Sequence, residues 1–172
     1  LYARSKVAGE ELVKQAQIAG IRTSILRFST VYGSPFDHAD RVIPAFCRAA
    51  LCNAPLRVEG QANCLDITHV ADVVQCVCSV ARGLFEGKTF APMHLTSGQG
   101  TCLSDLAKLV VQLAHSKSDI ITAAPRNFDV ARFVGDPKFA QTQGGWQAKI
   151  ALADGIQNLL AQFETVLKAP IS

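Results

Sequence analysis

The sequence lacks the long hydrophobic runs and single-sign charge runs that mark membrane-spanning or nucleic-acid-binding proteins. No apolar run approaches the roughly 18 residues of a membrane span, and no signal-peptide pattern opens the chain. Lysines and arginines are scattered and the formal net charge is only +3, so neither a membrane nor a nucleic acid is indicated as a partner. With 49% apolar and 18% charged residues among 172, the chain is expected to fold around a well-buried core.

The sequence also lacks a C-x-x-C pair, although it contains six cysteines. A metal site or a disulfide framework would require tighter, paired spacing with histidines nearby. The pattern therefore predicts free, buried thiols, no metal site and a reducing compartment, which makes the expected location cytoplasmic. The cysteines concerned are Cys47, Cys52, Cys64, Cys76, Cys78 and Cys102.

Proline is absent from residues 1–34, and helix-forming residues are dense up to Gly20, which predicts a helix that ends there. Tyr2 and Lys6 are one turn apart on this helix, so their side chains are neighbours, with Gly9 on the same face. A nearby ammonium group favours the phenolate, which suits a tyrosine that exchanges protons near neutral pH. Alone, the Tyr-x-x-x-Lys spacing is a weak signal, because a surface tyrosine beside a solvated lysine shares it.

The rest of the chain predicts an α/β fold with a parallel sheet. Residues 21–28 are short, β-branched and alternating, which indicates a buried strand, and helix, glycine turn and strand form half of a βαβ crossover. The helix expected at 70–84 is apolar nearly all round, which predicts burial against the sheet. Further strands are expected at 56–60, 90–95 and 120–123, and further helices at 41–53, 101–115 and 150–167.

Three stretches resemble the extended short-chain dehydrogenase/reductase superfamily, in which Tyr-x-x-x-Lys serves NAD-dependent sugar-nucleotide epimerases and dehydratases. Residues 2–10 resemble its active-site helix. Residues 26–33, L-R-F-S-T-V-Y-G, resemble its L-R-x-x-N-V-Y-G stretch, with Thr30 replacing the usual asparagine. Residues 65–73 resemble R-D-F-x-H-V-D-D-V, with Leu65 where many members carry an arginine.

The resemblance implies the carboxyl-terminal part of a Rossmann-like parallel sheet plus a smaller α/β substrate-binding region. Residues 1–35 would end the dinucleotide-binding domain. Residues 36–172 would mostly form the substrate-binding region, with 65–95 returning to the Rossmann sheet. The family's G-x-x-G-x-x-G fingerprint does not occur in the sequence, so we expect a fragment of a longer enzyme, without turnover of its own.

The resemblance also implies catalytic and cofactor-binding residues. Tyr2 would exchange a proton with a sugar hydroxyl while hydride passes transiently to or from the nicotinamide of NAD, with NADP as the alternative. Lys6 would bind the nicotinamide ribose and favour the phenolate of Tyr2. Phe28, Ser29 and Val31 would lie beside the nicotinamide.

A second set would bind the nucleotide sugar. Thr30 would face the sugar. Arg41 would approach the diphosphate, since an arginine at a helix start adds its charge to free N–H groups that favour an anion. Arg126, in a stretch at 125–130 similar to the family's P-x-R-x-G-D-V, would close on the diphosphate with a bidentate fork. Arg57 and Glu59 would approach the base or the ribose. The alternative for Arg41, Arg57 and Glu59 is an ordinary solvated charge, and for Arg126 it is a surface ion pair.

Several polar residues of the same motifs are predicted to be structural. Asp66 and His69 are expected to bond the loop and cap the helix that follows, with Thr68 as a candidate cap and Asp72 in the first turn. Trp146 is expected in the core.

As a partner of the complete enzyme the resemblance implies a second copy, because the family's tyrosine-bearing helix packs in a dimer's helix bundle. Two alternatives stay open: a non-catalytic nucleotide-binding or scaffold module, and a reductase of the same superfamily acting on a non-nucleotide carbonyl of the steroid or flavonoid type. Only a nucleotide-sugar enzyme or a nucleotide-binding module should bind a diphosphate at Arg41 and Arg126.

Overall fold

The computed structural model describes residues 1–126 and 130–168 of the chain. The elements run in the order α1 (Tyr2–Ile18), β1 (Leu26–Phe28), β2 (Thr30–Tyr32), α2 (Val42–Leu51), β3 (Leu56–Glu59), β4 (Cys64–His69), α3 (Val70–Phe85), β5 (Met93–Leu95), β6 (Gly100–Cys102), α4 (Leu103–Leu113), β7 (Ile120–Ala123), β8 (Arg132–Phe133), α5 (Lys138–Gly144) and α6 (Leu152–Lys168).

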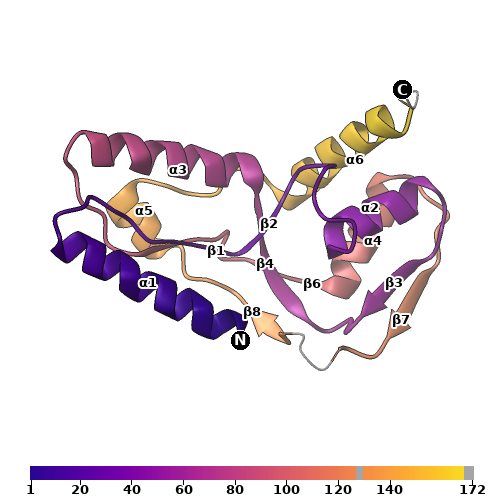
Figure 1. Cartoon of the computed structure of the whole chain (residues 1–172). Coiled ribbons are helices and arrows are strands. Elements are labelled where there is room, and N and C mark those ends of the chain that lie inside the picture. Colours follow the sequence, from indigo (N-terminus) through magenta and orange to yellow (C-terminus); the bar gives the residue numbers. More distant parts are fainter. Residues whose placement is uncertain (127–129, 169–172) are drawn as a thin grey trace.

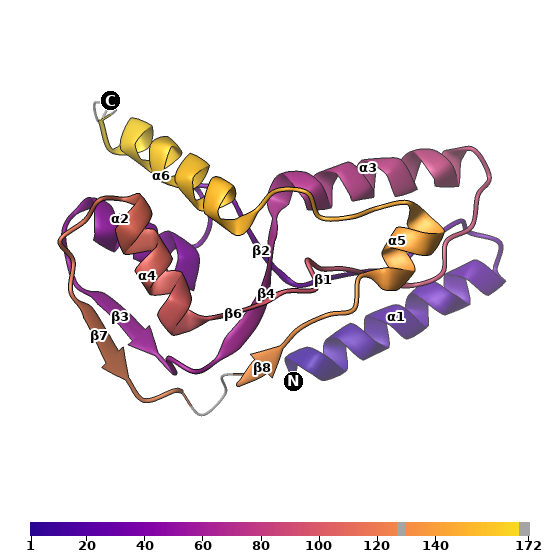
Figure 2. The ribbon, with the colours of Figure 1, turned by 180° about the vertical axis from the view of Figure 1, so that it is seen from behind.

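The molecule is elongated, with a different group of elements at each end. One end holds α1, α3 and α5 around β1 and β5, and the other holds α2, α4 and α6 with β3 and β7 (Figures 1 and 2). Strands β1 and β5, β2 and β4, and β3 and β7 pair in parallel, whereas β4 and β6 are antiparallel. The predicted α/β class with parallel pairing is therefore confirmed.

The larger core cluster lies where α2 and α4 pack against β3 and where α6 packs on α2 and α4. Leu56 and Val58 are fully buried, while Arg57 and Glu59, which alternate with them, face outward. Helix α6 contributes the stripe expected from its sequence, through Ile156, Leu159, Leu160 and Phe163. The buried face of β3 fixes the strand in the core, and its polar face is part of the candidate site.

The smaller cluster packs α3 and Trp146 against β5. Trp146 is buried, as predicted, and its indole Nε1 donates a 2.8 Å hydrogen bond to the Asp72 carbonyl oxygen. The expected burial of α3 against the sheet is confirmed for Val73, Cys76 and Val80, whereas the apolar Val74 and Val77 are 51% and 39% exposed. Only one face of α3 meets the sheet.

Several predicted boundaries were too wide. The strand expected at 21–28 is reduced to Leu26–Phe28 and the one expected at 90–95 to Met93–Leu95, because these two segments pair only over three residues. The helix expected from Thr101 begins at Leu103 instead, since Thr101 and Cys102 belong to β6, paired with β4. Tertiary strand pairing here overrides a local helical pattern.

The prediction of six free thiols is wrong for one pair, because Cys64 and Cys102 form a disulfide. The antiparallel register of β4 and β6 places them directly opposite each other. Cys47 and Cys76 are free and buried as expected, whereas Cys52 and Cys78 are free and exposed. The cysteines therefore no longer argue for a reducing compartment. Over residues 1–126 and 130–168, every helix is too short or too polar to cross a bilayer.

Candidate functional site

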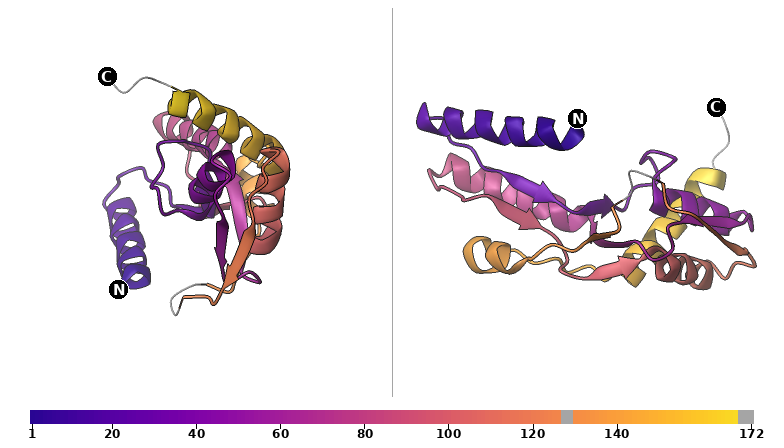
Figure 3. Two further views of the ribbon diagram at one scale, coloured as in Figure 1. Left: turned by 90° about the vertical axis from the view of Figure 1, so that its right-hand side faces the viewer. Right: turned by 90° about the horizontal axis from the view of Figure 1, so that it is seen from below.

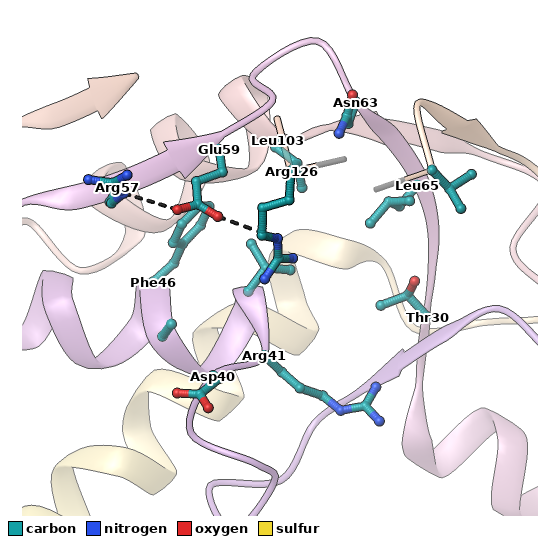
Figure 4. Close-up of a pocket in the computed structure, with 13 residues that line it drawn as sticks. Thr30, Asp40, Arg41, Phe46, Arg57, Glu59, Asn63, Leu65, Leu103 and Arg126 are labelled. Atoms are coloured by element: carbon teal, nitrogen blue, oxygen red, sulfur yellow. Dashed lines mark hydrogen bonds and ion pairs between the residues drawn. The ribbon is translucent and has the colours of Figure 1, made fainter. Parts of the chain in front are cut away.

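A pocket of about 360 Å³ brings together the predicted substrate-binding residues Thr30, Arg41, Arg57 and Arg126 (Figure 4). These residues come from distant parts of the sequence. The other residues that line the pocket are Asp40, Val42, Ala45, Phe46, Glu59, Asn63, Leu65, Leu103 and Val130.

Each arginine reaches the pocket from a different element. Arg41 is the N-cap residue of α2, with extended backbone and no side-chain cap on the first N–H groups of the helix. Arg57 lies on the outward face of β3. Arg126 follows β7, and because Glu59 pairs with Ala123 in the β3–β7 register, the chain after β7 arrives beside Glu59. The parallel pairing thus explains why these basic groups converge.

Carboxylates accompany the arginines. Glu59 Oε1 accepts a 3.0 Å hydrogen bond from Arg57 Nε, and Glu59 Oε2 lies 3.4 Å from Arg126 Nε. Asp37 Oδ1 lies 3.4 Å from Arg41 Nε. More than half of each arginine side chain is exposed, so these pairs are weakened by solvent and can exchange for a ligand anion.

The opposite wall of the pocket is apolar. Leu65 and Leu103 line it together with Phe46, and both leucines also contact the larger core cluster. Leu65 is the residue that departs from the family motif, so its side chain brings an aliphatic surface, and no charge, to the ligand space.

Tyr2 and Lys6 lie at the exposed amino-terminal end of α1. The Lys6 Nζ atom is 5.2 Å from the centre of the Tyr2 ring, as the four-residue spacing predicts, and the Tyr2 side chain is 75% exposed. This end of α1 lies at the end of the sheet where β1 and β5 finish (Figures 1 and 2). Ligands of α/β folds bind at that edge. Neither residue is among those described that line the pocket.

Helix α1 is attached to the sheet mainly by charge. Arg27 Nε and Nη2 donate 2.7 and 2.6 Å hydrogen bonds to the two carboxylate oxygens of Glu10, and Arg27 Nη1 lies 3.2 Å from His94 Nε2. The hydrogen bonds from Arg27 hold the pKa of Glu10 below its usual range. All 17 residues of α1 lie in the described part of the chain, and none of them is buried (Figure 3).

The three residues expected beside a nicotinamide differ in exposure. The Phe28 side chain is half exposed, at the carboxyl end of β1. Ser29 Oγ forms a 2.7 Å hydrogen bond with Thr68 Oγ1. Val31 packs partly on the smaller core cluster and lines a second hollow, of about 300 Å³, together with Arg41. Phe28 and Tyr2 are thus both accessible, and Lys6 lies beside the Tyr2 ring.

The predicted structural roles of Asp66 and His69 are confirmed. The fully buried Asp66 carboxylate accepts hydrogen bonds of 2.8 Å from both Ser97 N and Ser97 Oγ, 2.9 Å from Gly98 N and 3.3 Å from Gly135 N. His69 Nδ1 accepts from Ala71 N at 3.2 Å and caps α3, so Thr68 is not the cap. Burial lowers the pKa of His69.

Sequence reasoning missed Asn63 and Leu103, which line the pocket side by side. Leu103 N donates a 3.0 Å hydrogen bond to the Asn63 carbonyl oxygen where β6 leads into α4. The short β4–β6 pairing carries no local signal, so nothing in the sequence indicated this contact. Within the described ranges, no group of three or more His, Cys, Asp or Glu side chains is placed to hold a metal ion.

Residues 1–91 match the NAD dependent epimerase/dehydratase family. The putative UDP-glucose 4-epimerase of Methanocaldococcus jannaschii is 28% identical over 163 residues, covering 92% of this chain and 52% of that protein. The chain thus spans about half the length of this curated relative.

Two solved structures share the fold. The UDP-glucose 4-epimerase of Thermotoga maritima with UDP-glucose superimposes with a TM-score of 0.87 at 23% identity, over 97% of this chain and 54% of that one. The UDP-glucose 4-epimerase of Thermus thermophilus in complex with NAD gives 0.81 at 25% identity, over 95% and 53%. Because the family match covers more than half of the 172 residues, the chain belongs to the NAD-dependent epimerase/dehydratase family.

Proposed function

We propose that the complete protein is an NAD-dependent epimerase or dehydratase of a nucleotide sugar, and that this chain carries its proton-transfer pair and much of its sugar-nucleotide pocket. The observation that supports this most is the convergence of Thr30, Arg41, Arg57 and Arg126 on one pocket. UDP-glucose in the structure of the Thermotoga maritima enzyme indicates the ligand class to test first.

In this proposal the diphosphate lies between Arg41 and Arg126. Both guanidinium groups can donate paired hydrogen bonds to phosphate oxygens, and the uncapped start of α2 adds N–H groups beside Arg41. Arg57 and Glu59 meet the ribose or base, and Thr30 faces the sugar. Leu65 stands where many family members carry an arginine, so in this chain fewer cations hold the diphosphate than in those members.

Tyr2 and Lys6 supply the acid/base chemistry in this proposal. NAD, when bound, supplies a group that can take up and return a hydride. The Tyr2 phenolic oxygen takes a proton from the sugar hydroxyl and gives it back, and Lys6 favours the phenolate and bonds the ribose. Phe28, Ser29 and Val31 flank the nicotinamide.

We propose the division of the chain that the family resemblance implies. Residues 1–35 end a dinucleotide-binding domain and 36–172 mostly bind the substrate, with 65–95 returning to the first sheet. Parallel pairing of β1 with β5 supports this return.

We also propose a homodimer of the complete enzyme through α1, on whose surface Val7 is 70% and Leu12 66% exposed. Light scattering of the complete protein tests the dimer, and a monomer contradicts it.

Calorimetric titration of the 172-residue chain with UDP tests the pocket assignment. Arg41→Gln and Arg126→Gln should each weaken UDP binding by about tenfold, because each removes a charge-assisted contact to phosphate. The matched control is Arg82→Gln on the exposed side of α3, which should leave the affinity unchanged.

Wild-type affinity in both pocket variants would contradict the proposal. The apolar wall of Leu65 and Leu103 favours, as second candidate, the reductase of a non-nucleotide carbonyl, which predicts no dependence on diphosphate. If the protein is instead a non-catalytic module, it should still bind UDP, and Tyr2→Phe should change no activity of the complete protein.

A further inference from the structure

Glu59 places a carboxylate inside a pocket whose other charged groups are mainly cations. It stands on the polar face of β3, opposite the buried Val58, and 31% of its side chain is exposed. Its two oxygens serve two different arginines, Arg57 through Oε1 and Arg126 through Oε2 (Figure 4). One side chain thus bridges a strand residue and a residue that follows β7.

The bridge uses the Nε atom of each guanidinium group. A guanidinium group also carries two Nη nitrogens with N–H donors of their own. Figure 4 shows Arg126 projecting from the side of Glu59 toward the side of Arg41. Glu59 thereby contacts Arg126 at its Nε atom.

The same carboxylate reduces the positive charge of the pocket. The lining residues include three arginines, Asp40 and Glu59, so their formal charges sum to +1. Without Glu59 the sum would be +2, and Arg57 and Arg126 would each lose the carboxylate contact that they now make. A small anion, which binds by charge alone, should respond most to that difference.

We propose that Glu59 is the residue that makes this pocket select a nucleoside diphosphate over a free diphosphate anion. Its charge weakens binding of pyrophosphate or phosphate alone. A nucleoside diphosphate offsets this repulsion, because its ribose hydroxyls can donate hydrogen bonds to the carboxylate. The identity of the preferred ligand rests on the proposed function; the effect of the charge does not.

The experiment is calorimetric titration of the 172-residue chain with pyrophosphate and with UDP, for wild type, Glu59→Gln and Glu11→Gln. Glutamine keeps an oxygen for the arginine Nε atoms but removes the charge. Glu59→Gln should bind pyrophosphate about fivefold more tightly, while UDP, whose ribose hydroxyls lose a charged acceptor, gains less. Glu11→Gln changes the net charge equally on exposed α1 and should alter neither affinity.

Adding Arg126→Gln to Glu59→Gln should shrink the gain in pyrophosphate affinity, because the released cation is then absent. Circular dichroism confirms that each variant is folded. Unchanged or weaker pyrophosphate binding by Glu59→Gln, or an equal gain for UDP, would overturn the inference. If wild type binds no UDP while Glu59→Gln still gains pyrophosphate affinity, the proposed function fails and the charge effect of Glu59 survives.

Discussion

At the scale of single residues, Asp66 joins two loop segments through one buried carboxylate. Its oxygens accept from the backbone N–H groups of Ser97, Gly98 and Gly135, so Asp66→Ala would leave these partly buried donors without acceptors. Losing them should reduce the free energy of unfolding by about 3 kcal/mol. Urea unfolding followed by circular dichroism measures this. Asp105→Asn, on the exposed start of α4, is the control, and an equally small effect in both variants would contradict the prediction.

His69 should make stability depend on pH. Burial lowers its pKa below the ordinary 6.5, and its Nδ1 must stay unprotonated to accept from Ala71 N. Asp72 raises that pKa, but burial is the larger influence, and the other group against the ring is the neutral Tyr32. Below pH 6.5 the unfolded chain therefore binds the proton first, so stability falls as pH falls, by up to about 1.4 kcal/mol per pH unit.

Urea midpoints at pH 7.5 and 5.5 check the effect of His69. His69→Asn keeps a capping side chain without a titrating ring, so its midpoint should shift less between the two pH values. His38→Gln removes an exposed histidine and should preserve the wild-type shift. An unchanged shift in His69→Asn would assign the pH dependence to other groups.

At the scale of elements, the sequence was sufficient where the pattern was local. The 120–123 strand, the apolar stripe of α6 and the end of α1 near Gly20 follow from periodicity and a glycine with φ +88°. The limits of β1 and β5 follow from their mutual pairing over three residues, which no local pattern encodes. Similarly, Arg57 and Glu59 share a face by alternation, whereas Asn63 and Leu103 meet only through the β4–β6 register.

The Cys64–Cys102 disulfide should stabilise the chain measurably. It closes a loop with a sequence separation of 38 residues, for which the loss of unfolded-chain entropy corresponds to roughly 3–4 kcal/mol. Urea unfolding with and without reductant should show this difference in wild type and in Cys52→Ser/Cys78→Ser. The Cys64→Ser/Cys102→Ser variant should be insensitive to reductant. Thiol titration of the denatured, unreduced protein should count four free thiols, and a count of six would contradict the bridge.

The attachment of α1 to the sheet should depend on the Arg27–Glu10 pair, because α1 buries no side chain. Arg27→Gln should therefore speed amide hydrogen exchange in residues 2–18 and leave α6, which is packed in the larger core cluster, unchanged. Arg22→Gln, in the segment that joins α1 to β1, is the matched control. Equal exchange in wild type and Arg27→Gln would mean that other contacts hold α1.

At the scale of the whole molecule, the two ends present their binding groups differently. The pocket lined by Thr30, Arg41, Arg57 and Arg126 is built between elements that share the larger core cluster, so packing positions the backbone around it. The groups proposed for NAD lie on open surface instead, with Tyr2 75% and Phe28 50% exposed. Binding to open surface gains less from burial and from preorganised contacts than binding in a pocket.

The 172-residue chain should therefore bind UDP at least about tenfold more tightly than NAD and should convert no UDP-glucose in the presence of NAD. Calorimetric titration with each ligand and chromatography of the reaction mixture measure the two outcomes. Tyr2→Phe should leave the UDP affinity unchanged, because Tyr2 does not line the pocket. NAD binding as tight as UDP binding, or measurable turnover, would show that the exposed end of α1 and the carboxyl end of β1 already form a working cofactor site.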